Sequence, residues 1–472
     1  MPFARTPTAA ALAALRDAEP TPFWLDSPHR PTPQASLTRP DSTELAVVGA
    51  GYTGLWTALL AKQADPDRDV VVLEQSTAGH AASGRNGGFC SASLTHGLAN
   101  GAARFEAELP RLLQLGRQNL DAIEATVTEQ GIDCGFERTG ELDVATDLHQ
   151  VAELHEYAQL AARCGEEVTV LDADAVRAEV DSPRYLAGLL DRHGTAMVDP
   201  ARLAWGLRDA CLRSGVRLYE RTPVLALSAD AAGVRLRTPY GGVRAARVAL
   251  AGNAFPPLLN RIRHYVVPVY DYAVVTEPLN PMQRKEIGWA GRQGVADAGN
   301  QFHYYRLTAD DRILFGGYDA IYHRGNGFGP QHEQRPASFA LLATHLAETF
   351  PQLEGVRITH AWGGAIDTCS RFSPFWGTAH AGRVAYVAGF TGLGVGATRF
   401  GAAVMLDLLE RRDSELTRLQ MVRSKPLPFP PEPLRGIGID LTRWSLDRAD
   451  RSGGHRNLWL RVLDRLGLGF DS

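Results

Sequence analysis

The 472-residue sequence predicts an α/β protein with a Rossmann-like dinucleotide-binding domain and a second domain built on an antiparallel sheet. Three observations support this fold class: a βαβ pattern near the N-terminus, a block of long strands in the middle of the chain, and a second strand, glycine turn and helix at residues 384–410. The chain is longer than one hydrophobic core usually holds, so two domains are expected.

The βαβ pattern occupies residues 44–74. An apolar strand is followed by a G-x-G-x-x-G turn made of Gly49, Gly51, Tyr52, Thr53 and Gly54. The first glycine allows the tight turn, the second lets backbone approach a pyrophosphate, and the third lets a helix pack closely on the strand. A second strand ends at Glu74, next to Gln75, and the Glu74 carboxylate can accept hydrogen bonds from a ribose. This order of features predicts dinucleotide binding rather than a merely glycine-rich turn.

Composition argues against several function classes. The formal net charge is −4, whereas a nucleic-acid partner would require a basic surplus. The five cysteines are scattered and form no C-x-x-C pattern, so neither a disulfide framework nor a metal site is indicated, and a cytoplasmic location is expected. No apolar run approaches the length of a membrane span, so no membrane partner is expected. The alanine-rich residues 9–14 predict a short surface helix rather than a signal peptide.

Periodicity and turn residues place the other elements. Helices are predicted at residues 54–63, 102–130, 148–164, 172–180, 200–213, 335–350 and 395–410. Strands are predicted at residues 45–48, 69–73, 139–146, 216–219, 223–228, 234–238, 243–251, 265–276, 302–307, 312–317, 356–366 and 384–388. The intervening residues 79–101 are rich in glycine, serine and asparagine, which predicts a long ordered loop beside the cofactor.

These elements divide the chain into four regions. The dinucleotide-binding domain is predicted to comprise residues 44–110, 190–264 and 360–412, and the substrate domain residues 111–189 and 265–359. Residues 1–43 form a proline-rich extended arm that Phe23 and Trp24 could pin to the body. The tail, residues 413–472, carries an amphipathic helix near residues 457–466. We expect this helix to pack on the body or on a second subunit, which leaves a homo-oligomer open, because its polar face mixes acid with base.

A series of short segments follows in order along the body of the chain. They are VVGAGYTGL with Glu74, ASGRNGG at residues 82–88, Asp199-Pro200, TPV at residues 222–224, LAGNAF at residues 250–255, FGGYD at residues 315–319, WGG at residues 362–364 and YVAGFTGLGVG at residues 386–396. This series resembles the D-amino-acid oxidase family of FAD-dependent oxidoreductases, and within it the γ-glutamylputrescine oxidase branch. The resemblance implies a glutathione-reductase-type βαβ unit with an inserted β-meander.

The resemblance also implies FAD as the cofactor and assigns contacts to it. The pyrophosphate, ribityl chain and flavin ring would lie along Ser83, Arg85, Asn86, Gly87 and Gly88, with the Val224 backbone at the adenine. The pyrimidine edge of the flavin would meet the turn Gly389, Phe390, Thr391, Gly392, Leu393 and Gly394, where a helix N-terminus can stabilise the charge of the reduced ring. From the sequence pattern, Ala251 and Gly252 end a strand expected to press on the dinucleotide. A surface ion pair for Arg85 and loop capping for Asn86 remain alternatives.

Three departures from the family pattern bear on the chemistry. Leu393 stands where relatives often carry histidine, Cys369 is out of register with the flavin-linking cysteine of sarcosine oxidases, and the strand at residues 312–316 contains no lysine. We therefore expect non-covalent FAD. Whether oxygen or another electron acceptor is used, which separates an oxidase from a dehydrogenase, stays open.

Five residues are candidates for the chemistry: His96, Tyr272, Tyr305, Arg306 and Trp362. Amine oxidation by a flavin needs a neutral nitrogen and an α C–H close to flavin N5. The aromatic candidates, with Tyr270 on the same strand face as Tyr272 and with Tyr304, would form apolar walls, although each alone is more often simple core. His96 could exchange a proton or be a structural loop residue, and Arg306 could bind a substrate carboxylate or face solvent.

The predicted function is oxidation of a C–N bond of a small amine or amino acid by hydride transfer to flavin N5, giving an imine and then a carbonyl product. Two alternatives remain. The chain could be the flavin-holding subunit of a larger assembly without its own amine oxidation, or a flavoenzyme of specialised metabolism acting on another substrate.

Overall fold

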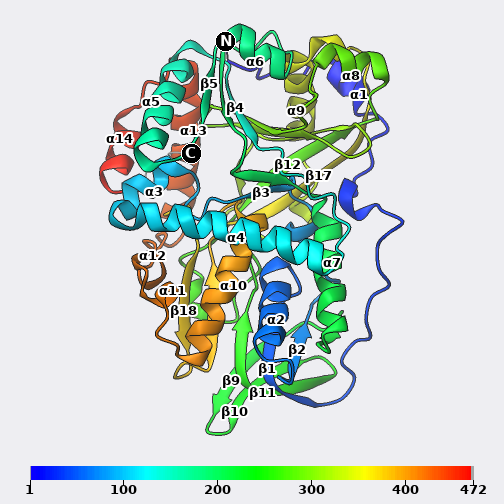
Figure 1. Cartoon of the computed structure of the whole chain (residues 1–472), viewed down its shortest axis with the longest axis vertical. Helices are drawn as coiled ribbons and strands as arrows, with labels where there is room; N and C mark the ends of the chain where they lie inside the picture. The colour runs from blue at the N-terminus through cyan, green and yellow to red at the C-terminus, as the bar shows by residue number, and fades with distance from the viewer. Residues whose placement is uncertain (1, 469–472) are drawn as a thin grey trace.

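The computed structural model describes residues 2–468. Their strands form an eight-stranded sheet, a nine-stranded sheet and a two-stranded pair. In Figure 1 the eight-stranded sheet and its helices occupy the lower half, the nine-stranded sheet occupies the upper half, and α4 (Leu109–Glu129) crosses between them. The predicted fold class, an α/β dinucleotide-binding half joined to a second sheet, is confirmed.

The first sheet is built around parallel strands. Its strands are β1 (Asp41–Val48), β2 (Val70–Leu73), β8 (Arg217–Tyr219), β9 (Ala226–Asp230), β10 (Gly233–Thr238), β11 (Gly241–Leu250), β18 (Phe375–Ala379) and β19 (Val384–Ala388). The order is β18-β19-β11-β1-β2-β8, and β9 and β10 continue from β11 as the meander. Strand β2 reads VVVL and is buried along its whole length, as expected for a parallel strand covered on both faces.

The second sheet is mostly antiparallel. Its strands are β4 (Glu141–Ala145), β5 (Thr169–Leu171), β6 (Ala187–Asp191), β12 (Val267–Thr276), β13 (Gly294–Asp297), β14 (His303–Leu307), β15 (Ile313–Gly317), β16 (Ile321–Tyr322) and β17 (Ile358–Thr368). In this sheet, as far as residues 2–468 describe it, only β13 and β4 pair in parallel. Strand β17 pairs along β12, so the predicted domain boundary at residue 360 falls inside a strand of this sheet. The separate pair consists of β3 (Phe89–Ser91) and β7 (Thr195–Met197).

Helices cover both sheets. Besides α4 they are α1 (Ala9–Ala14), α2 (Tyr52–Ala64), α3 (Leu98–Phe105), α5 (Leu148–Cys164), α6 (Ala173–Glu179), α7 (Pro200–Arg213), α8 (Pro281–Ile287), α9 (Pro336–Thr349), α10 (Gly394–Glu410), α11 (Glu415–Arg418), α12 (Gln420–Arg423), α13 (Leu434–Arg451) and α14 (Leu458–Arg465). The single helix predicted at residues 102–130 is two, α3 and α4. The break precedes Pro110, which lies in the first turn of α4 because proline starts a helix more easily than it continues one.

The C-terminal tail folds back on the second sheet. Asp450 at the end of α13 accepts hydrogen bonds from the Asn300 amide at 2.9 Å and the Gln301 amide at 3.0 Å. Helix α14 matches the predicted amphipathic helix, whereas α13 was not predicted. Its first five residues include Gly436 and Gly438, and glycine weakens the helical signal of a sequence.

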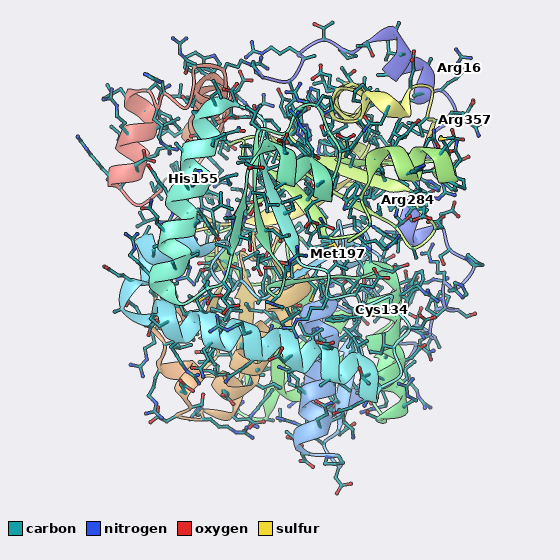
Figure 2. All side chains as sticks on the ribbon, turned by 45° about the horizontal axis from the view of Figure 1, so that its top comes forward. Arg16, Cys134, His155, Met197, Arg284 and Arg357 are labelled. Atoms are coloured by element: carbon teal, nitrogen blue, oxygen red, sulfur yellow. The ribbon has the colours of Figure 1, made fainter. Side chains whose placement is uncertain are left out.

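Side chains fill the space between the ribbons, as Figure 2 shows around the buried Cys134 and Met197. Cys90, Cys134, Cys164, Cys211 and Cys369 all carry free thiols. Across residues 2–468, no helix combines the length and the apolar character needed to cross a bilayer. The N-terminal arm runs along one side of the molecule, from the second sheet down to β1 (Figure 1).

Candidate active site

Three of the predicted cofactor segments follow the carboxyl ends of adjacent parallel strands. Val48 of β1 lies opposite Leu250 of β11, and Leu250 lies opposite Tyr386 of β19. The turn at residues 49–54, the pair at residues 251–252 and the turn at residues 389–394 therefore emerge at one edge of the first sheet. This is the edge at which open α/β sheets bind their ligands.

Close packing explains why the first turn needs glycine. Gly49 has a φ of +102°, which side chains rarely adopt. A Cβ on Gly54 would lie 1.8 Å from the Gly49 carbonyl oxygen. Helix α2 begins directly after Gly51, and the Tyr52 amide donates a hydrogen bond to Ser83 Oγ at 3.0 Å. The first amides of a helix have no partners within the helix, and this arrangement can bind phosphate.

Glu74 braces the same turn. Its carboxylate accepts hydrogen bonds from the Ala50 amide at 2.7 Å and the Ser76 amide at 2.8 Å. Burial raises the pKa of Glu74, and the amide hydrogen bonds oppose that rise. The contact of Glu74 with a ribose stays a prediction.

The second glycine turn is held by Asp367, which the sequence reading missed. This carboxylate, at the end of β17, accepts hydrogen bonds from the Gly389 amide at 2.6 Å and the Phe390 amide at 3.2 Å. Burial raises its pKa to about 6. Helix α10 then begins at Gly394, so a second helix N-terminus faces the same space as α2. A single acid late in a strand gave no spacing signal from which this role could be read.

Two tryptophans hold the glycine-rich loop at residues 82–88. The Trp362 indole on β17 donates a hydrogen bond to the Arg85 carbonyl at 2.9 Å, and the Trp24 indole donates to the Asn86 carbonyl, also at 2.9 Å. Trp24 thus pins the N-terminal arm at the loop.

The side chains of Arg85 and Asn86 act within the protein. Arg85 pairs with Glu333 at 2.5 Å and donates a hydrogen bond to the His80 carbonyl. Asn86 donates to the Ala82 carbonyl and accepts from the Gly88 amide. Arg85 therefore forms an ion pair and Asn86 caps the loop, which were the two alternatives to a flavin contact. A flavin contact remains a prediction for both residues.

A cavity of about 1550 Å³ joins these segments to the second sheet and the tail. The predicted cofactor residues on its wall are Gly51, Tyr52, Thr53, Ser83, Arg85, Asn86, Gly87, Ala251, Phe390, Thr391, Gly392, Leu393 and Gly394. The predicted cofactor residues that do not line it are Gly49, Gly54, Glu74, Gln75, Gly88, Val224, Gly252 and Gly389. Small-molecule sites span roughly 300–1,000 Å³, so this space fits a dinucleotide together with a substrate. The two helix N-termini and the closely packed turns suit the phosphates and ring of FAD.

The second sheet forms the opposite wall with alternate residues of β12. Val267, Val269, Asp271 and Ala273 line the cavity. Tyr270 and Tyr272 share a face as predicted, but their hydroxyls donate to the carbonyls of Gly329 at 3.2 Å and His332 at 2.9 Å. Tyr272 borders the cavity while its ring packs on Phe339, so this tyrosine face is mainly core. Alternation shows which residues share a face but not which face meets the cavity.

Two predicted catalytic residues lie outside the cavity wall. The Tyr305 hydroxyl shares a hydrogen bond of 2.7 Å with the Tyr185 hydroxyl inside the core of the second sheet. Arg306 is buried, and its guanidinium donates to the Val198 carbonyl at 2.7 Å. Burial lowers the pKa of Arg306 to about 10. Backbone carbonyls, rather than solvent or a substrate carboxylate, therefore occupy the Arg306 guanidinium.

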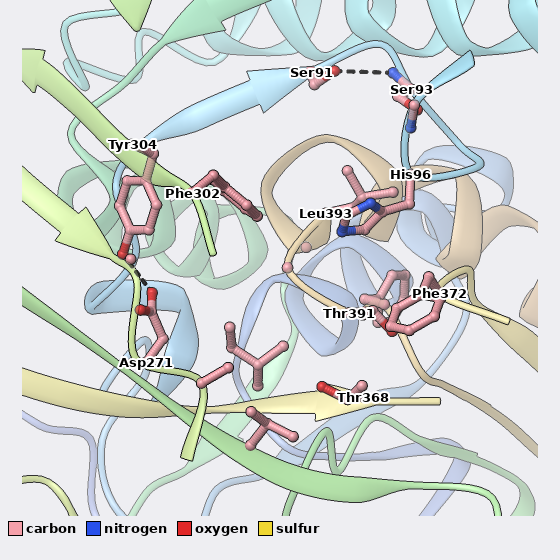
Figure 3. A pocket seen from close by; sticks show the side chains of 18 of the residues that line it. Ser91, Ser93, His96, Asp271, Phe302, Tyr304, Thr368, Phe372, Thr391 and Leu393 are labelled. Atoms are coloured by element: carbon pink, nitrogen blue, oxygen red, sulfur yellow. Dashed lines mark hydrogen bonds between the residues drawn. The ribbon is translucent and has the colours of Figure 1, made fainter. Parts of the chain in front are cut away.

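His96 and Trp362 do line the cavity. Figure 3 shows His96 beside Leu393 and Thr391, opposite the pair formed by Asp271 and Tyr304. Burial lowers the pKa of His96, so its imidazole is neutral at pH 7. The Asp271 and Tyr304 pair was not predicted as a unit, because its members come from strands separated in sequence.

Comparison with known proteins agrees with this geometry. The family described as FAD dependent oxidoreductase matches residues 44–408. Gamma-glutamylputrescine oxidoreductase of Escherichia coli (strain K12) is 33% identical over 422 residues, which cover 86% of this chain and 92% of that protein. Glycine oxidase from Geobacillus kaustophilus superposes with a TM-score of 0.66 at 22% identity, covering 81% of this chain and 99% of that one. L-proline dehydrogenase from P. horikoshii superposes with a TM-score of 0.65 at 18% identity, covering 80% and 96%.

Proposed function

Because this chain belongs to the FAD dependent oxidoreductase family, we propose that it oxidises the C–N bond of a small amine or amino acid. One observation carries the proposal. The glycine turns after β1 and β19 open into the same cavity as the second sheet, so a substrate on that sheet would face the bound cofactor. The relative from Escherichia coli is named for an amine substrate, which supports the same class.

The residues that would hold FAD are distributed along its length. The turn at residues 49–54 and the start of α2 would bind the pyrophosphate, with Glu74 and Gln75 near the ribose. Residues 83–88, 224 and 251–252 would contact the ring system, ribityl chain and adenine. The turn at residues 389–394 would meet the pyrimidine edge, with α10 directed at it. When bound, FAD supplies the acceptor for a hydride and then passes the electrons on.

The protein has three tasks toward the substrate. The wall around Phe302, Phe372 and Leu393 excludes water and favours an uncharged nitrogen, because an unpaired cation is costly to bury. The neutral imidazole of His96 can accept a proton or a hydrogen bond. Loss of a hydride from the α-carbon and of a proton from nitrogen gives an imine, which water converts to a carbonyl compound and an amine or ammonia.

Anaerobic mixing tests this proposal. Purified yellow protein is combined with polyamines, sarcosine, glycine and D-amino acids while the visible flavin band is followed. Bleaching by one of these compounds is the expected result. Admitting air then separates the two kinds of enzyme, since an oxidase reoxidises at once and releases peroxide. If no compound bleaches the band and only a partner protein reduces it, the chain is the flavin-holding subunit of an assembly.

A further inference from the structure

Asp271 is one of several carboxylates that the second sheet presents to the cavity, and it lies beside the cofactor loop. It lies on the cavity-facing side of β12, opposite Gly364 of β17. A Cβ built on Gly364 would have only the Arg85 side chain within 4 Å, at 3.8 Å. The space next to Asp271 is therefore open, and it adjoins the loop at residues 82–88.

Tyr304 fixes the direction of this carboxylate. Its hydroxyl donates a hydrogen bond to Asp271 Oδ2 at 2.6 Å (Figure 3). The tyrosine ring fits between Gly87 and Gly316, where added Cβ atoms would come within 2.7 Å and 2.6 Å of it. Because Gly87 belongs to the cofactor loop, the same ring contacts that loop and orients Asp271.

Asp271 keeps acceptor capacity for a ligand. Besides Tyr304, it accepts hydrogen bonds from the Tyr272 amide at 2.8 Å and from the Gly317 amide. A carboxylate offers about four lone pairs, so room for a further donor remains. Within residues 2–468, no ion pair involves Asp271.

The charges around Asp271 favour a cation. The neighbouring positions on β15 and β17 are glycines, and the charged side chain that adds to the rise in the pKa of Asp271 is Asp319, which pairs with Arg335. Each arginine on the cavity wall already has an acceptor: Arg85 has Glu333, Arg117 has Glu166, Arg435 has Asn326 and Arg443 has Asp319. Each of these guanidinium groups thus has an acidic or amide group of the protein beside it, whereas Asp271 has no cationic partner among the described residues and is available to an ammonium group.

We propose that Asp271, oriented by Tyr304, binds the ammonium group of the substrate amine and takes its proton before the α C–H bond breaks. This inference rests on the proposed function. The proton leaves nitrogen for a carboxylate oxygen, so R–NH3⁺ and the carboxylate become R–NH2 and a carboxylic acid. The nitrogen lone pair is then free to form the imine.

The carboxylate of Asp271 suits this task. Burial raises its pKa to about 6, while the Tyr304 hydrogen bond opposes the rise. Asp271 is thus charged at pH 8 and protonated at pH 5. The affinity of Asp271 for a cation should therefore be high above pH 6 and should decrease as the pH falls through that value.

A ligand that cannot be oxidised tests the binding step. The FAD-loaded protein is titrated with tert-butylammonium, which has no α C–H, and with neutral tert-butanol of the same shape, by calorimetry at pH 8 and pH 5. We expect at least tenfold preference for the cation at pH 8 and its loss at pH 5. Asp271→Asn should remove the preference at both pH values. Tyr304→Phe should move its midpoint to higher pH, because Asp271 loses a hydrogen bond.

Asp271→Asn should still fold, since an aspartate with a raised pKa costs stability as the pH rises through about 6. Its melting temperature at pH 8 should equal or exceed that of the wild type. The surface variant Asp230→Asn, which makes the same charge change far from the cavity, should keep the cation preference.

Reduction of the flavin tests the proton transfer separately. The substrate is the amine that bleaches the wild type fastest. At pH 8 the flavin of Asp271→Asn should be reduced at least tenfold more slowly than that of the wild type. This rate should recover as the pH rises toward the amine's own pKa, because neutral amine is then abundant. The inference is overturned if tert-butylammonium does not bind, if it binds no better than the alcohol, or if Asp271→Asn keeps the preference or the rate. Those results would leave the proposed function standing, whereas failure of every amine to bleach the wild type would remove the function.

Discussion

The two sides of the cavity are built by different means. On the first sheet, backbone lines the cavity: the turns at residues 49–54 and 389–394 present amides, and Glu74 and Asp367 brace them from behind. On the second sheet, side chains such as Asp271 and Trp362 line the cavity. Backbone sites depend on glycine spacing, whereas side-chain sites depend on which face of a strand turns inward. The side formed by the first sheet is accordingly less tolerant of substitution and easier to predict from the sequence.

Gly54→Ala should have the largest effect, because the new Cβ would lie 1.8 Å from a backbone oxygen. We expect the purified variant to contain less than a tenth of the wild-type flavin, measured by absorbance after denaturation. The control is Gly438→Ala, where an added Cβ meets nothing within 4 Å. Normal flavin content in Gly54→Ala would show that the turn does not depend on close packing.

Asp367→Ala should have the next largest effect, because it leaves the Gly389 and Phe390 amides without their buried acceptor. Loss of hydrogen bonds to a charged group predicts a decrease of about 3 kcal/mol in the free energy of unfolding. Asp367→Asn, which keeps one acceptor oxygen, should lose less. Urea denaturation of both variants measures the difference. Equal stability of Asp367→Ala and wild type would contradict the bracing role.

Trp24→Phe should cost less, since it removes one indole hydrogen bond to the Asn86 carbonyl. A decrease of about 1 kcal/mol is expected, which corresponds to roughly fivefold weaker flavin binding. Dialysis against FAD with fluorescence detection would measure it. Trp444→Phe on the exposed side of α13 is the matched control. A larger loss in the control than in Trp24→Phe would argue against the arm as a support of the loop.

Tyr305→Phe should have the smallest effect on catalysis, because its hydroxyl faces Tyr185 in the core. The rate of flavin reduction should stay within twofold of the wild type, while the free energy of unfolding falls by about 1 kcal/mol. Stopped-flow reduction and urea denaturation give the two values. A tenfold loss of rate would indicate that Tyr305 acts on the substrate. It would contradict the distinction between Tyr305, which lies in the core, and Tyr304, which faces the cavity.

The first sheet was predicted closely except for β18, where no strand was predicted. Helix α7 occupies residues 200–213 as expected, and its N-cap Asp199 accepts a hydrogen bond from the Arg202 amide. Strand β19 also has its predicted bounds. The second sheet was predicted as strands, but the small β5, β6, β13 and β16 were not, and the helix α13 was missed. Short strands carry too few residues for a period to show, and glycines obscured α13.

Glycine spacing and strand alternation are properties of neighbouring residues, so the order of residues along the chain was enough to place the two glycine turns after their strands and to put Tyr270 and Tyr272 on one face of β12. The side of β12 that faces the cavity depends on how the two sheets pack, and that packing turned the tyrosines into the core and Asp271 toward the open space. Contacts such as Asp367 with Gly389, Trp24 with Asn86 and Tyr304 with Asp271 join distant segments. Because they arise only when the sheets, the arm and the loop come together, no local pattern could reveal them.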